Sequence, residues 1–152
     1  MLINIRHTGL VVRDIIKSRT FYEGIGFVVE KQITESGEFI SHVVGIPNVQ
    51  VETIKMKSPD GGLIELLQYQ SIVDSSHIVN QPSNQLGCSH LAMTVHSIDD
   101  FCELIKNLGG SVVNPPRKSN DGKVSVAYCH DNEGILLEIV QEFEQHIAHD
   151  KR

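Results

Sequence analysis

The sequence predicts an α+β protein built from two β-α-β-β-β modules in tandem. Three observations support this prediction: one order of strand-like and helix-like segments occurs twice, both copies end in the same turn and strand, and a polar segment separates the copies. The 152 residues have the length of one ordinary domain, with 40% hydrophobic and 21% charged residues. This composition is typical of a globular chain and not of a disordered or fibrous one.

Each copy opens with a strand followed by a helix. The strand and helix are predicted at residues 5–12 and 14–24 in the first copy and at residues 89–95 and 97–108 in the second. Asp14 and Ser97 are the predicted N-caps, and glycines follow both helices. His7 and His90 therefore occupy equivalent places in the two copies.

Each copy closes with a turn and an apolar strand that contains one glutamate and, three residues later, one glutamine. The closing strands are predicted at residues 63–68 and 135–141 and contain Glu65 and Glu138. The His-to-Glu separation is 65 − 7 = 58 residues in the first copy and 138 − 90 = 48 in the second. We place the ten extra residues near 39–48, which include a turn at 45–48. Further strands are predicted at residues 27–34, 49–57, 111–113 and 124–130.

These boundaries give a first module at residues 1–70 and a second module at residues 88–141. The segment 71–87 between them is rich in Ser, Asn and Gln and is predicted to be a linker. Residues 142–152 form a polar tail, predicted to be a short surface helix or a frayed end.

Composition excludes several classes of function. The formal charge is 13 − 19 = −6 and no basic run occurs, which argues against a nucleic-acid partner. No apolar run is long enough to span a membrane, and the N-terminus lacks the apolar core of a secretory signal. Three scattered cysteines are too few for a disulfide framework or a zinc knuckle. We therefore expect a reduced, cytoplasmic protein that acts on a small-molecule substrate.

Two histidines and two glutamates form the candidate site. Each lies in a strand row that is otherwise small or apolar, and we expect these strands to be covered on both faces by residues such as Leu66, Leu91, Val95, Leu137 and Ile139. A buried carboxylate must be paired, protonated or bound to a metal. Four such groups at matched repeat positions can share one divalent cation: His7, Glu65, His90 and Glu138. Imidazole suits Zn, Ni, Co and Fe, and carboxylate also accepts Mn and Mg.

A structural role is the alternative for each of these residues taken singly. A lone strand histidine is usually structural, and Glu65 has Arg6 and Lys55 as possible ion-pair partners. The joint pattern of four residues favours the metal site. Among the other histidines, only His42 is a candidate to reach a pocket.

Four motifs also carry a resemblance to a known family. They are His7-Thr8-Gly9-Leu10-Val11-Val12-Arg13-Asp14, Gly62-Leu63-Ile64-Glu65-Leu66, Ser89-His90-Leu91-Ala92 and Gly134-Ile135-Leu136-Leu137-Glu138. Over residues 3–141 the chain resembles the vicinal oxygen chelate superfamily, also called the glyoxalase/bleomycin resistance/dioxygenase group. The resemblance implies two βαβββ modules whose eight strands form an open curved sheet around one divalent metal ion. It also implies His7, Glu65, His90 and Glu138 as the ligands.

Subgroups of this family differ in their ligands. Extradiol dioxygenases use two His and one Glu on iron, so Glu65 argues against that chemistry. The chain is most similar to glyoxalase I-like lyases, which have two His and two Glu, and to methylmalonyl-CoA epimerases. The epimerases have glutamine at the position of Glu65 and a further glutamate base, for which Glu38 is the nearest acid here. Bleomycin-binding members lack the metal ligands.

The resemblance favours a metal-dependent lyase/isomerase or epimerase. A substrate with two neighbouring oxygens would chelate the metal, which stabilises an enediolate after Glu138 or Glu65 removes a proton beside the carbonyl. The alternatives are a non-catalytic small-molecule binding or antibiotic resistance protein, an extradiol-type dioxygenase and a metal-assisted thiol transferase. One fold hosts many reactions, so the substrate stays open.

The separation of the modules bears on assembly. Glu65 and His90 are 90 − 65 = 25 residues apart, which is long enough for both modules of one chain to complete one site. Glyoxalase I-like dimers instead share each site between chains. We expect a homodimer in either case, because open sheets leave strand edges that need cover.

Overall fold

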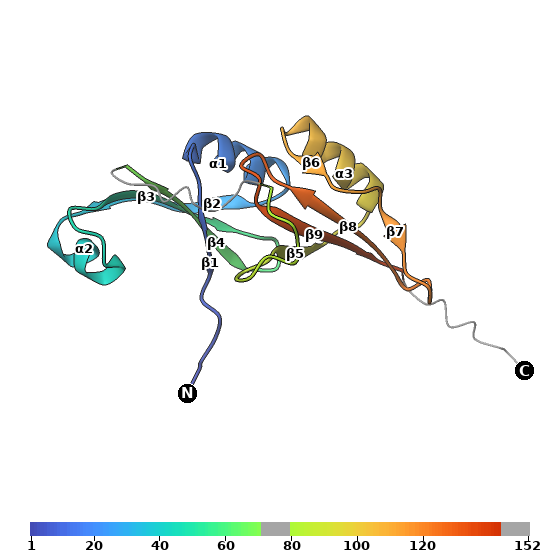
Figure 1. Cartoon of the computed structure of the whole chain (residues 1–152), viewed down its shortest axis with the longest axis horizontal. Helices are drawn as coiled ribbons and strands as arrows, with labels where there is room; N and C mark the ends of the chain where they lie inside the picture. The colour runs from blue at the N-terminus through green and yellow to red at the C-terminus, as the bar shows by residue number, and fades with distance from the viewer. Residues whose placement is uncertain (71–79, 144–152) are drawn as a thin grey trace, which may run out of the picture. The chain divides into compact units, whose positions relative to one another are not determined.

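The structure, a computed structural model, describes residues 1–70 and 80–143. The chain divides into two compact units, Met1–Ile78 and Val79–Arg152, and each unit contains one sheet (Figure 1). Residues 71–79 of the expected linker and 144–152 of the expected tail lie outside the described residues. None of the helices in the described ranges is long and apolar enough to cross a membrane.

The first unit is a four-stranded sheet with two helices. Its elements, in chain order, are β1 (Thr8–Val11), α1 (Ile15–Gly24), β2 (Val28–Ser36), α2 (Glu38–Val44), β3 (Gln50–Lys57) and β4 (Leu63–Tyr69). The strand order is β1-β4-β3-β2. Strands β1 and β4 are parallel, whereas the other neighbours are antiparallel. The first and last strands of the module are therefore neighbours.

The second unit repeats this arrangement. Its elements are β5 (Leu91–Thr94), α3 (Ile98–Asn107), β6 (Ser111–Val112), β7 (Arg117–Lys118), β8 (Val124–His130) and β9 (Leu136–Glu142). The strand order is β5-β9-β8-β6, and β7 also pairs with β8. Strands β5 and β9 are parallel, as β1 and β4 are in the first unit. The predicted α+β fold of two tandem modules is confirmed.

Two short elements were not predicted. All eight expected strands are present within the described ranges, and β7 is an additional strand of two residues. The ten extra residues of the first module form helix α2 rather than a turn alone. Gly45 ends this helix with a φ of 71°, a left-handed conformation that glycine adopts without steric cost. The predicted turn begins at this residue.

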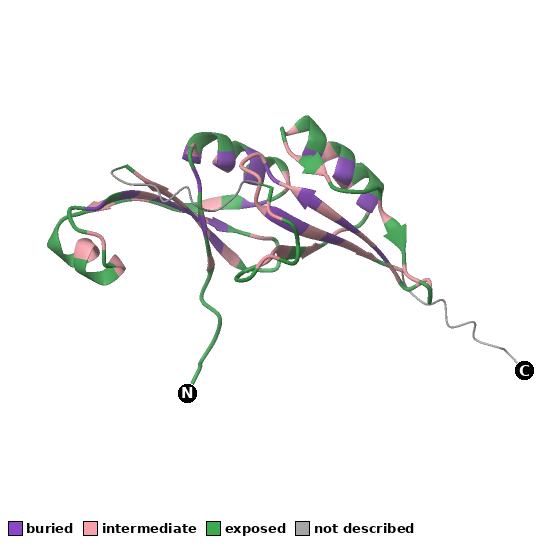
Figure 2. Cartoon of the chain, in the orientation of Figure 1, coloured by how far each residue is buried: buried purple, intermediate pink, exposed green. Residues whose placement is uncertain are grey.

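One face of each sheet packs against a helix. In the first unit, α1 contacts β2, β3 and β4, and Ile54 and Leu66 are fully buried. Figure 2 shows buried positions in purple on the helices and strands of both units. In the second unit, Leu137 and Ile139 are fully buried. The expected burial of Leu66, Leu137 and Ile139 is thus confirmed. Leu91 and Val95 are only half-buried, so their strand is less well covered than its sequence indicates.

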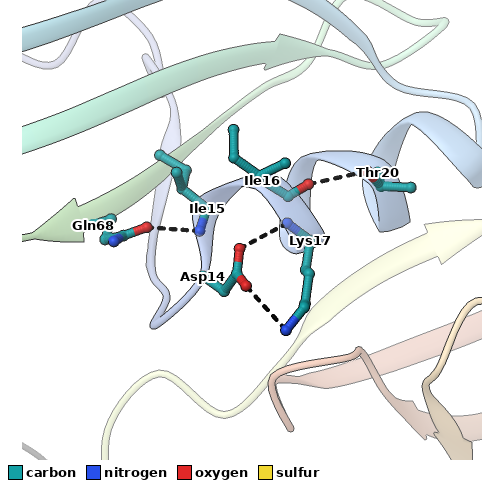
Figure 3. Close-up of polar contacts among 6 residues, drawn as sticks. All are labelled: Asp14, Ile15, Ile16, Lys17, Thr20 and Gln68. Carbon is teal, nitrogen blue, oxygen red and sulfur yellow. Dashed lines mark hydrogen bonds and ion pairs between the residues drawn. The ribbon is translucent and has the colours of Figure 1, made fainter.

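Both helix N-caps are confirmed. The Asp14 side chain accepts a hydrogen bond from Lys17 N at 3.1 Å (Figure 3). The Ser97 hydroxyl accepts one from Asp100 N at 3.4 Å. Each cap satisfies one of the backbone N–H groups that a helix start leaves without an intrahelical partner. The helices therefore begin one residue after each predicted cap.

Candidate metal centre

The first unit brings His7 and Glu65 together. Glu65 lies on β4 and pairs in register with Gly9 of β1, two residues after His7. Since side chains two residues apart share a face of an extended chain, His7, immediately before β1, projects beside Glu65. His7 Nε2 is 3.1 Å from Glu65 Oε2. We call these two residues half-site 1.

The second unit makes the same pair from the same register. Glu138 on β9 pairs with Ala92 of β5, two residues after His90. His90 Nε2 is 2.9 Å from Glu138 Oε2. We call these two residues half-site 2. The parallel pairing of first and last strands thus explains why the repeat places one His and one Glu at fixed positions.

The four side chains are less buried than the sequence pattern indicates. The exposed fraction of the Glu65 side chain is 12%, and that of the Glu138 side chain is 25%. The two histidine side chains are about one-third exposed. Both glutamates therefore lie at partly open positions, where an ion and a substrate can approach.

The carboxylate of half-site 1 has a second partner. Lys55 lies directly opposite Glu65 in the antiparallel pair of β3 and β4, and its Nζ is 3.1 Å from Glu65 Oε1. The ion pair with Lys55, expected as an alternative for Glu65, is present together with the His7 contact. Glu65 consequently has one oxygen on an imidazole and the other on an ammonium group.

Half-site 2 has an aromatic neighbour where half-site 1 has a lysine. Tyr128 lies opposite Glu138 in the pair of β8 and β9, and its ring stands edge-on to His90 with 5.2 Å between centroids. Burial raises the pKa of the Tyr128 hydroxyl, and the Glu138 carboxylate raises it further. His90 Nδ1 is 3.0 Å from Ser89 Oγ, a contact that orients the ring with Nε2 toward Glu138.

Each half-site fits the donor set of a divalent cation. An imidazole nitrogen and a carboxylate oxygen are both common ligands of Zn, Ni, Co, Fe and Mn. Two ligand atoms about 2.1 Å from one metal and at right angles lie about 3 Å apart. The separations of 3.1 and 2.9 Å match this geometry. Among the residues that the structure describes, no group of three or more His, Cys, Asp or Glu side chains is gathered for a metal.

His42 lies elsewhere in the first unit. It projects from α2 and lines a cavity of about 740 Å³ together with Glu38. The lining residues of this cavity lie between positions 36 and 50, and neither His7 nor Glu65 is among them. The structure therefore gives His42 a cavity of its own and does not bring it to half-site 1.

Sequence reasoning missed Tyr128 and the cavity that it lines. This cavity of about 1040 Å³ lies in the second unit, and its lining also includes Arg117, His130 and Leu136. The alternation of side chains along β8 places Tyr128 opposite Glu138, as Lys55 lies opposite Glu65 in the first module. Without the hairpin register, that equivalence could not be recognised.

The fold and the duplicated His–Glu pair define the class: a tandem β-α-β-β-β protein with one such pair in each module. The chain belongs to the Glyoxalase/Bleomycin resistance protein/Dioxygenase superfamily, which it matches over residues 4–139. It is 29% identical over 137 residues to a probable lactoylglutathione lyase of Synechocystis sp., an alignment that covers 89% of this chain and 92% of that protein.

Solved structures show the same fold. A glyoxalase family protein from Bacillus cereus matches with a TM-score of 0.88 and 26% identity, over 95% of this chain and 97% of that one. The fosfomycin resistance protein FosX of Listeria monocytogenes matches with a TM-score of 0.61 and 20% identity, over 91% and 90% of the two chains. That FosX structure is a complex of a mutant with Mn(II) and a dihydroxypropylphosphonic acid.

Proposed function

We propose that the protein is a divalent-metal-dependent lyase/isomerase or epimerase of the glyoxalase type. It would act on a small molecule with two neighbouring oxygens by removing a proton next to a carbonyl group. The observation that carries this proposal is the repetition of one His–Glu pair at one register in both modules. Relatives named as probable lactoylglutathione lyases support a lyase of this superfamily.

His7, Glu65, His90 and Glu138 would together hold one ion per site. When bound, a divalent cation supplies a Lewis acid that stabilises the negative charge developing on the two substrate oxygens. The two glutamate carboxylates balance the charge of such a cation, and the two neutral imidazoles add none. The donor set admits Zn, Ni, Co, Mn, Fe or Mg. The Mn(II) in the FosX complex supports a metal of this group.

Glu138 is the proposed base. Among the described residues, Glu65 has both His7 and Lys55 as ion-pair partners, whereas Glu138 has His90. Glu138 also has the more exposed side chain. Its carboxylate is therefore freer to turn toward a substrate, accept the proton and return it. Return to the opposite face of the same carbon gives epimerisation, and return to the adjacent carbon gives isomerisation.

We further propose that the protein is a cytoplasmic homodimer and that one chain supplies all four ligands. The separation of 25 residues between Glu65 and His90 supports this arrangement, because it is long enough for both modules of one chain to complete one site. Neither a nucleic acid nor a membrane is a proposed partner.

A binding or antibiotic resistance protein is the second candidate function. The fold likeness to FosX favours it among the alternatives. Such a protein would hold a chelating small molecule in the same site. A metal-assisted thiol transferase is less favoured, because Cys88 has no activating partner among the described residues. An extradiol-type dioxygenase is less favoured, because Glu65 occupies a position that extradiol enzymes do not use as a ligand.

Solvent deuterium uptake distinguishes the two functions. Lactoylglutathione is the first compound to test, because two relatives are named probable lactoylglutathione lyases. Other 2-hydroxy carbonyl compounds and CoA thioesters follow. Metal-loaded wild type should exchange the proton next to the carbonyl, and Glu138→Gln should lose 10²–10⁴-fold in exchange rate while it keeps its metal. Full exchange by Glu138→Gln with loss only in Glu65→Gln would reverse the base assignment. Tight binding of these compounds without exchange would favour the binding protein.

A further inference from the structure

Half-site 1 belongs to a row of three charged side chains. Glu65 on β4 lies opposite Lys55 on β3, and Lys55 lies opposite Lys31 on β2. Directly opposed residues of neighbouring strands project from the same face of a sheet. The row therefore crosses three strands on one face, and Lys55 is its middle member.

This face is the one that α1 leaves uncovered. Ile54 and Met56 alternate with Lys55 along β3 and are fully buried, so they project toward the helix and Lys55 projects away from it. The exposed fraction of the Lys55 side chain is 27%, and Lys31 is exposed. Both ammonium groups can consequently be reached by a small molecule.

The row has an excess of positive charge. Two lysines face one carboxylate, and like charges directly opposite each other destabilise a sheet. In the described part of the chain, Glu65 is the ion-pair partner of Lys55, and Lys31 has none within 4 Å. A further anion at this row would relieve the repulsion between the two lysines.

The second module has no lysine opposite its site glutamate. Tyr128 takes the place of Lys55 opposite Glu138. On its other side, the Tyr128 carbonyl accepts a backbone hydrogen bond from Val113 N, just after β6. The two half-sites therefore match in their ligands and differ in their neighbours. The residue opposite the glutamate of half-site 1 is cationic, and the residue opposite the glutamate of half-site 2 is aromatic.

We propose that Lys55, with Lys31 beside it, binds an anionic oxygen group of the substrate. This inference rests on the proposed function and narrows its substrate class to 2-hydroxy carbonyl compounds that also have a carboxylate or phosphate group. With one divalent cation, two carboxylates and two neutral imidazoles, the site has no net charge. Lys55 and Lys31 add two positive charges, which a phosphate dianion or a carboxylate would offset in full or in part.

Binding of three probes to the Mn²⁺-loaded protein tests this proposal by calorimetry. Dihydroxyacetone, hydroxypyruvate and dihydroxyacetone phosphate share a hydroxymethyl ketone and differ in charge. Wild type should bind at least one charged probe at least tenfold more tightly than dihydroxyacetone. Tighter binding of hydroxypyruvate would identify a carboxylate as the preferred group, and tighter binding of dihydroxyacetone phosphate would identify a phosphate. Lys55→Met should lose most of that preference, and Lys55→Arg should keep most of it.

Lys17→Met is the matched control. Lys17 is a lysine of the same unit on α1, which packs on the other face of the sheet, so its removal changes net charge equally. This control should retain the wild-type preference. Unchanged preference in Lys55→Met, or equal affinity of wild type for all three probes, would overturn the inference. Failure of wild type to bind Mn²⁺ at all would contradict the proposed function instead, so the two failures are distinguishable.

Discussion

The side-chain oxygen of Gln68 accepts a hydrogen bond of 2.8 Å from the backbone N–H of Ile15, so the last strand of the first module caps the start of its helix (Figure 3). The second module repeats this contact between Gln141 and Ile98 at 3.0 Å. The first N–H groups of a helix have no intrahelical partner. The glutamine three residues after each site glutamate thus fastens the helix to the strand that presents that glutamate.

Removal of this glutamine should destabilise the protein. Gln68→Ala leaves a partly buried N–H without its acceptor, which costs about 1–3 kcal/mol in the free energy of unfolding. Urea denaturation measures the loss. Gln70→Ala, an exposed glutamine two residues further on, is the control and should change the free energy by less than about 0.5 kcal/mol. Equal losses in the two variants would refute the capping role.

The Asp14 cap should make the free energy of unfolding depend on pH. The backbone N–H of Lys17 donates to the Asp14 carboxylate, and the Lys17 side chain adds to this effect, so the pKa of Asp14 lies below its ordinary value of 3.8. A carboxyl with a depressed folded-state pKa stabilises the fold fully above the ordinary value and loses that contribution as the pH falls through the folded-state pKa. Asp14→Asn should therefore lose less stability than wild type between pH 5 and pH 2.5. Parallel urea midpoints for the two proteins would contradict this.

The three cysteines should differ sharply in reactivity. Burial raises the pKa of the Cys102 thiol, and it raises the pKa of Cys129 to about 12, so neither forms much thiolate at pH 8. Cys88 is exposed. Iodoacetamide should add one label per folded chain, at Cys88, and three labels in guanidinium chloride. Labels on Cys102 or Cys129 at the rate of Cys88 in the folded protein would be incompatible with their burial.

The sequence predicted the fold well because the repeat is expressed in local patterns. Asp14 and Ser97 cap their helices as predicted, and the strand that contains Tyr128 was placed at its observed bounds. Helix α2 was missed because its seven residues include no buried position from which a periodic apolar pattern could arise. Strand β7 is too short to have any pattern.

The site was predictable only in part. The pairs His7–Glu65 and His90–Glu138 follow from the repeat together with the parallel pairing of first and last strands. The neighbours of these pairs depend on the register of the β3–β4 and β8–β9 hairpins. Lys55 could be named as a possible partner of Glu65, but nothing in the chain order shows that Tyr128 occupies the equivalent place beside Glu138.

Mixed dimers test the origin of the four ligands. If one chain supplies all four, a mixture of His7→Ala and Glu138→Ala chains should stay inactive, because neither chain has an intact set. Deuterium uptake by the refolded mixture, relative to each variant alone, is the measurement. Recovery toward a quarter or more of wild-type activity would show that each site is shared between chains.

The metal content of the purified chain tests the central claim most directly. If His7, Glu65, His90 and Glu138 bind one ion, wild type should hold one divalent cation per chain by elemental analysis after dialysis. His7→Ala and His90→Ala should each lose it, whereas His42→Ala should retain it. Stoichiometric metal in His7→Ala or in His90→Ala, or two ions per wild-type chain, would show that the two half-sites do not join in one centre.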